Sequence, residues 1–273
     1  MKPLLLLALL ACACTGDSAA PHLARGNVLV NNGKREEAAA EYRKAAELAP
    51  KSALSRERLG DTLYDLGRKN EALAAYRDAT RVDPGSPTTH IGAARVLSDQ
   101  GDLTAARAEL TAALDRAPSN LFALLSRGNL AARAGDKKAA LADYAQAVHL
   151  KSDNVPALYQ YGLALLDDGQ VPEAAATFDR ILGSSRDSPE GYYGRARVFA
   201  ARGEGAFAAE ALGEAFKRVA ADARTRLHEQ GLQGPALEAQ VQAATERALA
   251  QAKTEPAFAR WANDPGFRGT AGW

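Results

Sequence analysis

The stretch Asn31–Tyr42, NNGKREEAAAEY, places Gly33 five residues before Ala38, and the same pair returns at a fixed interval along the chain. The later pairs are Gly67 and Ala72, Gly101 and Ala106, Gly135 and Ala140, Gly169 and Ala174, and Gly203 and Ala208. Each of the six copies follows the previous one by 34 residues, without an insertion. A period of this length indicates a stack of repeated supersecondary units.

Further positions repeat in the same register. A small residue begins the apolar pattern of each unit, at Gly26, Gly60, Ala94, Gly128, Gly162 and Ala196. A large side chain stands four residues after each repeated alanine, at Tyr42, Tyr76, Leu110, Tyr144, Phe178 and Leu212. Spacings of three and four residues form one face of a helix. Each unit therefore predicts two helices, joined where the glycine adopts the left-handed conformation that ends the first helix.

The composition of the 273-residue chain supports this prediction and limits the classes of partner. Hydrophobic residues make up 47% of the sequence and aromatic residues 6%, and alanine is abundant, which favours helices over sheets. The chain has 34 basic and 33 acidic residues. Because this balance creates no basic field, we expect an all-α protein without a nucleic-acid partner.

This pattern resembles the tetratricopeptide repeat (TPR) over residues 19–222, in its 34-residue period, its close-contact alanine, its following aromatic residue and the closing Pro50, Pro84 and Pro118. The expected units are 19–52, 53–86, 87–120, 121–154, 155–188 and 189–222. The resemblance implies a right-handed all-α solenoid of six helix-turn-helix repeats.

The period is lost after residue 222, so we expect residues 223–273 to form a helical cap and a tail. Gly234 and Pro235 break the helix that the last repeat extends, and an amphipathic segment follows. The tail carries Trp261 and Trp273. Two interpretations of it stay open: it packs on the last repeat, or it is a short binding peptide.

The N-terminus has the pattern of an export signal. MKPLLLLALLACAC contains one basic residue and an apolar run that is shorter than the roughly 20 residues a membrane-spanning helix needs. Its end resembles a bacterial lipoprotein box, with Cys12 or Cys14 as the lipidated residue. We expect a signal peptide over residues 1–13 and a short linker over 14–18. Since no aspartate directly follows either cysteine, the resemblance implies a lipid anchor in the outer membrane, facing the periplasm.

No catalytic grouping stands out, so we expect a protein that is not an enzyme and that needs neither a metal nor another cofactor. The four histidines are not paired at metal-ligand spacing, and the glycines follow the repeat instead of forming a phosphate-binding loop. His22 and His90 occupy equivalent repeat positions. We expect both to be partly buried and hydrogen-bonded.

The function is therefore expected on a surface. In the TPR family the first helices line a concave groove that binds peptides or protein segments. The matching positions are Asn27, Tyr64, Ile91, Arg95, Phe122, Leu125, Asn129, Arg133, Tyr159, Leu163, Tyr193 and Arg197. Several of these side chains could instead pack between repeats.

The expected function is that of a membrane-anchored scaffold for another protein or peptide of the bacterial cell envelope. The combination of six repeats with a lipid anchor also resembles the pilotin lipoproteins of type IV pilus secretins. An adaptor that recruits peptidoglycan hydrolases is a further alternative.

Overall fold

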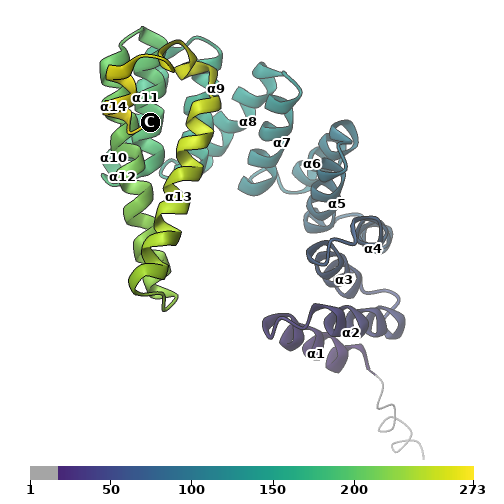
Figure 1. Ribbon diagram of the computed structural model, residues 1–273. Helices are drawn as coiled ribbons and strands as arrows, with labels where there is room; N and C mark the ends of the chain where they lie inside the picture. The colour runs from purple at the N-terminus through teal and green to yellow at the C-terminus, as the bar shows by residue number, and fades with distance from the viewer. Residues whose placement is uncertain (1–17) are drawn as a thin grey trace, which may run out of the picture. The chain divides into compact units, whose positions relative to one another are not determined.

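The computed structural model describes residues 18–273, and within this range it contains fourteen α-helices, one 310-helix and no strand (Figure 1). The predicted signal peptide and the two candidate lipidation sites, Cys12 and Cys14, lie outside the described residues. Consecutive helices pack in pairs, which confirms the predicted all-α solenoid of helix pairs.

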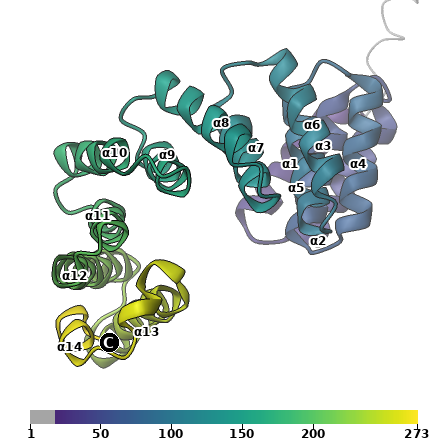
Figure 2. The same ribbon diagram turned by 90° about the horizontal axis from the view of Figure 1, so that it is seen from above.

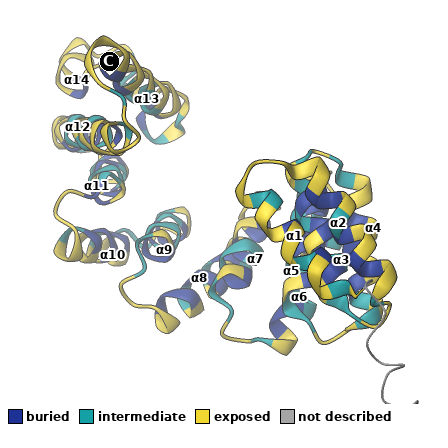
Figure 3. Ribbon diagram, turned by 90° about the horizontal axis from the view of Figure 1, so that it is seen from below, coloured by how far each residue is buried: buried dark blue, intermediate teal, exposed yellow. Residues whose placement is uncertain are grey.

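The chain divides into two compact units, and the first comprises residues up to Leu130. Its helices are α1 (Ala19–Asn31), α2 (Arg35–Leu48), α3 (Ala53–Asp65), α4 (Lys69–Val82), α5 (Pro87–Asp99), α6 (Leu103–Arg116) and most of α7 (Leu121–Arg133). Figure 3 shows that buried residues, in dark blue, gather on the sides of these helices that face one another.

The second unit comprises Ala131–Trp273. Its helices are α8 (Lys137–Leu150), α9 (Val155–Asp167), α10 (Val171–Ser184), α11 (Pro189–Arg202), α12 (Gly205–Glu229), α13 (Gly234–Thr254), the 310-helix η1 (Pro256–Trp261) and α14 (Pro265–Ala271). Figure 2 shows α12, α13 and α14 together at one end of this unit.

The repeated glycines make the turns within the helix pairs. All six have left-handed backbone conformation, with φ between 75° at Gly33 and 85° at Gly101. This conformation strains any residue that has a Cβ atom, whereas glycine adopts it freely. The role predicted for these glycines is therefore confirmed.

The repeated alanines and aromatic residues form the core of each pair. Ala38 and its five equivalents have at most 2% of their surface exposed. The ring of Tyr76 is fully buried and occupies the space beside Gly60, where a Cβ atom would lie 2.8 Å from the ring. Phe178 occupies the same place beside Gly162, at 2.6 Å. The small residue of the first helix thus makes room for the large residue of the second.

The two equivalent histidines make the same contact in the first and third repeats. Nδ1 of His22 lies 2.6 Å from Oε2 of Glu41, and Nδ1 of His90 lies 2.6 Å from Oε2 of Glu109. Hydrogen bonds from His22 and Arg25 lower the pKa of Glu41. The prediction that these histidines are hydrogen-bonded parts of the helix pairs is confirmed.

The C-terminal residues pack on the last repeat. Helix α12 has 25 residues, 11 more than the 14-residue α10. Helix α13 packs along α12 through Leu237 and Val241. The chain then returns over α11 and α12 through η1 and α14. Phe258 is fully buried in this cluster, and Trp261 and Trp273 pack against it. Of the two interpretations of the tail, the structure shows the packed one.

Among residues 18–273, none of the helices combines the length and the apolar composition that a membrane-crossing segment requires.

Candidate functional site

A cavity of about 320 Å³ opens among the first helices of the first unit, and we call it the first groove. Its lining residues are Glu57, Asp61, Thr88, Ile91, Gly92, Arg95, Asn120 and Phe122. They come from α3, α5, the start of α7 and the turn before it, because the first helix of each repeat presents the same face. The structure therefore brings three of the predicted residues, Ile91, Arg95 and Phe122, to one site.

Arg95 is held in place by its neighbours in the first groove. Its Nη2 donates to the hydroxyl of Tyr76 at 3.2 Å and to Oδ1 of Asp61 at 3.4 Å. The guanidinium carbon lies 3.9 Å from the centroid of the Tyr64 ring, a cation–π arrangement. Because 39% of the side chain stays exposed, a fixed cation faces the groove.

Hydrogen bonds and burial raise the pKa values of the two phenols beside Arg95, Tyr64 and Tyr76. The hydroxyl of Tyr64 donates to Oδ2 of Asp99 at 2.7 Å, which raises the pKa of Tyr64 and lowers the pKa of Asp99. Burial, followed by the hydrogen bond to Asp61, raises the pKa of Tyr76 well above its usual value. At neutral pH both phenols are therefore neutral donors.

Phe122 provides the apolar part of the first groove. It is one of the most exposed large apolar side chains among the described residues, with 58% of its surface accessible. Ile91 lies beside it in the cavity and is partly buried. Aromatic residues and arginine are enriched among the interface residues that contribute most of the binding free energy. The pair of an exposed Phe122 and a fixed Arg95 therefore has the composition of a protein-binding site.

In the second unit, Tyr193 and Arg197 contact the C-terminal segment of the same chain, whereas the Tyr159 ring meets Phe178 of α10 edge-on at 6.0 Å. Nη1 of Arg197 lies 3.0 Å from Oε2 of Glu255, and the Tyr193 ring meets Phe258 edge-on at 6.0 Å. Burial raises the pKa of Tyr159 to about 12, and it also raises the pKa of Tyr193. In this conformation the three side chains already have intramolecular partners.

A sequence model described as the tetratricopeptide repeat matches residues 23–87, 91–157, 125–190 and 159–227, which together span well over half of the chain. The chain belongs to the tetratricopeptide repeat family. Membership in the TPR family indicates a scaffold for protein–protein interaction. No curated protein sequence matches the chain significantly.

Solved TPR structures share the fold. YrrB, described as a TPR protein with an unusual peptide-binding site, is 23% identical, with a TM-score of 0.57 over 70% of this chain and 98% of that one. PilF of Pseudomonas aeruginosa is 17% identical, with a TM-score of 0.62 over 82% and 96%. PilW, a type IV pilus biogenesis factor, is 17% identical, with a TM-score of 0.61 over 71% and 90%. At these identities the likeness concerns the TPR fold alone.

The remaining predicted groove residues of the TPR pattern are not among the lining residues of the first groove. Asn27 is exposed on α1, and its Oδ1 accepts a hydrogen bond from Tyr42 at 2.7 Å. Leu125 and Leu163 are partly buried, whereas Asn129 and Arg133 are exposed. A role for these residues, and for Tyr159, Tyr193 and Arg197, in binding a partner stays a prediction.

Sequence reasoning missed Glu57 and Thr88 as groove residues and Glu255 as the partner of Arg197. Thr88 donates to Glu57 at 2.8 Å, which ties α5 to α3 at the edge of the groove. The spacing of the repeats could have suggested Glu57 and Thr88, whereas Glu255 lies beyond the periodic part. Within residues 18–273, no group of three or more side chains is arranged to hold a metal ion.

Proposed function

We propose that this TPR protein is a scaffold that holds a segment of a partner protein in the first groove. The observation that carries the proposal is the exposed Phe122 beside Ile91 and the fixed guanidinium of Arg95. An apolar side chain of the partner would pack against Phe122 and Ile91. A carbonyl or carboxylate oxygen beside it would accept from Arg95, whose orientation is already set before binding.

We infer that the scaffold works at the surface of the bacterial cell envelope. The support is the apolar N-terminal run that ends in Cys12 and Cys14. Residues 15–18 separate the second cysteine from α1, and at about 3.3 Å per residue they keep the helical domain close to a lipid anchor. An outer-membrane location facing the periplasm is part of this proposal.

Mass spectrometry of the purified protein tests the anchor. The expected result is a diacyl or triacyl modification that Cys12→Ala or Cys14→Ala abolishes. An unmodified N-terminus, or acylation that survives both substitutions together, would remove the envelope anchor from the proposal and leave the groove unaffected.

A pilotin-like role in assembling an outer-membrane secretin or type IV pilus is the second candidate. The fold likeness to PilF and PilW favours it. It predicts that the partner captured by the first groove is a secretin subunit.

Capture of partners from a detergent extract of the cell envelope tests the groove. The full-length chain, the variant Ile91→Ala/Phe122→Ala and the control Leu48→Ala would be compared. Leu48 is 37% exposed on the second helix of the first repeat, so it matches in chemistry but lies outside the groove. We expect the double variant to weaken the dominant interaction at least tenfold, about 1.4 kcal/mol.

Equal capture by all three proteins would contradict the groove assignment. Tyr159→Ala and Tyr193→Ala are unsuitable as a first test, because they would remove the edge-on ring contacts of Tyr159 with Phe178 and of Tyr193 with Phe258.

A further inference from the structure

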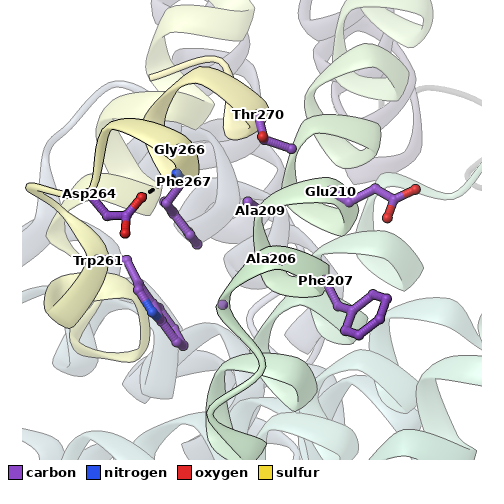
Figure 4. Close-up of a pocket in the computed structure, with 10 residues that line it drawn as sticks. Ala206, Phe207, Ala209, Glu210, Trp261, Asp264, Gly266, Phe267 and Thr270 are labelled. Carbon is purple, nitrogen blue, oxygen red and sulfur yellow. Dashed lines mark hydrogen bonds between the residues drawn. The ribbon is translucent and has the colours of Figure 1, made fainter.

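A larger cavity, of about 470 Å³, lies between the start of α12 and the C-terminal segment, and it shares no lining residue with the first groove. We call it the tail pocket. Figure 4 shows Trp261, Asp264 and Phe267 on the side of the C-terminal segment and Glu210 on the side of α12. All of these belong to the second unit, and the proposed function does not use them.

The wall of the tail pocket is built before any ligand arrives. The rings of Trp261 and Phe267 stack with 5.5 Å between centroids and 7° between planes. The guanidinium carbon of Arg260 lies 3.9 Å from the centroid of the Trp261 ring. A Cβ atom on Gly205 would lie 2.5 Å from Nε1 of Trp261, so glycine allows this close approach. Binding would therefore cost little reorganisation of the aromatic wall.

An exposed aromatic side chain stands at the same pocket. Phe207 lines it with 57% of its surface accessible, and its ring lies 5.5 Å from that of Phe199. A pocket with an aromatic wall and an exposed phenylalanine at its edge favours a large apolar side chain as its occupant.

Two carboxylates line the tail pocket, and the guanidinium of Arg260 lies on the Trp261 ring of its wall without being a lining residue itself. Among its lining residues, all of which the structure describes, the charged ones are the carboxylates Glu210 and Asp264. One oxygen of Asp264 accepts from the backbone N–H of Phe267 at 2.7 Å and caps α14. The side chain of Glu210 is exposed. These carboxylates attract a cation and repel an acidic segment.

We propose that the tail pocket docks a short segment of a partner protein in which a large apolar side chain adjoins a lysine or arginine. The apolar side chain packs against Trp261, Phe267 and Phe207. The cation lies near Glu210 and Asp264. The TPR scaffold would then have a second docking surface between the last repeat and the C-terminal segment, and its carboxylates would select a cationic ligand.

The two tryptophans of the chain allow a direct test. The full-length protein would be labelled with 5-fluorotryptophan, so that its fluorine NMR spectrum contains one signal for Trp261 and one for Trp273. The probe is the peptide Gly-Ser-Phe-Lys-Ser-Gly, acetylated and amidated at its ends. Matched peptides carry glutamate in place of lysine, or alanine in place of phenylalanine.

We expect the phenylalanine–lysine peptide to shift the Trp261 signal saturably and to bind at least fivefold more tightly than either matched peptide. Glu210→Lys should weaken this binding about fivefold, as expected for a partly exposed charge pair. Glu229→Lys is the control, because it makes the same charge change at an exposed position at the end of α12. An unchanged Trp273 signal and helical circular dichroism would show that the variants are folded.

Three results would overturn the proposal. The first is the absence of a saturable Trp261 shift with the phenylalanine–lysine peptide. The second is equal weakening by Glu210→Lys and Glu229→Lys. The third is a Trp261 signal that moves with protein concentration alone, which would assign the pocket to a second copy of this chain.

Discussion

Replacing Tyr76 with phenylalanine separates the contribution of one hydroxyl from that of the buried ring. The hydroxyl donates to Oδ1 of Asp61 at 2.6 Å and accepts from Nη2 of Arg95 at 3.2 Å. Tyr42, at the equivalent position of the first repeat, donates instead to the neutral Oδ1 of Asn27 at 2.7 Å. Both rings are buried, with 0% and 2% of their surface exposed. Tyr42→Phe is therefore a matched control for Tyr76→Phe.

The two substitutions should differ in their cost to the free energy of unfolding. A hydrogen bond to a charged group contributes about 1.5–3 kcal/mol, and one between neutral groups about 0.5–1.5 kcal/mol. Because 42% of the Asp61 side chain is exposed, water replaces part of the lost interaction. We therefore expect about 1.5 kcal/mol for Tyr76→Phe and about 0.5 kcal/mol for Tyr42→Phe.

Urea unfolding followed by circular dichroism measures both variants, with Asp61→Asn and the double variant Asp61→Asn/Tyr76→Phe completing a mutant cycle. We expect the effects of Asp61→Asn and Tyr76→Phe to be non-additive. The reasoning is refuted if Tyr42→Phe costs as much as Tyr76→Phe, or if the two changes at Asp61 and Tyr76 simply add. Either result would mean that the carboxylate contributes nothing beyond ring packing.

Three further measurements test other parts of the structure. Gly101→Ala should lower the free energy of unfolding by about 1–2 kcal/mol, because φ is 85° at this position. Gly183→Ala should raise it by about 0.5–1 kcal/mol, because Gly183 lies within α10 and no atom lies within 4 Å of the added Cβ. Urea unfolding measures both variants, and changes of the same sign would contradict this prediction. Phe258→Ala should lower the free energy of unfolding by about 3–5 kcal/mol, because Phe258 is fully buried. It should also shift tryptophan fluorescence to longer wavelength, because Trp261 packs against the same cluster. Unchanged fluorescence would contradict that packing. The hydrogen bond from Tyr64 lowers the pKa of Asp99 in the folded protein below its ordinary value near 3.8. The ionised carboxylate therefore stabilises the fold at pH values above about 3.8, and this stabilisation is lost as the pH falls through the lowered pKa. The difference in urea midpoint between the wild type and Asp99→Asn should therefore narrow between pH 5 and pH 3, and a constant difference would count against the hydrogen bond.

The periodic part of the fold was predictable because each repeated residue has one physical task. Gly33 and its equivalents need left-handed backbone conformation, and Ala38 and its equivalents lie where two helices touch. Both requirements are local, so a 34-residue spacing is enough to find them. The histidine contacts could be predicted for the same reason, since His22 and His90 share one repeat position.

The sites were predictable only in part, because they depend on contacts between distant segments. Phe122 and Arg95 follow from their places on first helices, and the structure puts both in one cavity. The pairing of Arg197 with Glu255 could not be derived, since the C-terminal segment has no repeat register that would place it. The tail pocket could not be derived for the same reason, because its aromatic wall and α12 are brought together by tertiary packing that no sequence repeat marks.

The packing of the C-terminal segment has a consequence for how this protein could change in length. Its contacts are with α11 and α12, the helices of the last repeat, and Tyr159 of α9 lines a small cavity beside α13. A duplicated 34-residue module inserted before α9 would leave every one of those neighbours unchanged. One inserted after α12 would separate α13 and α14 from the surfaces that bury them. Growth by tandem duplication is therefore compatible with the interior of the array and incompatible with its final helix pair.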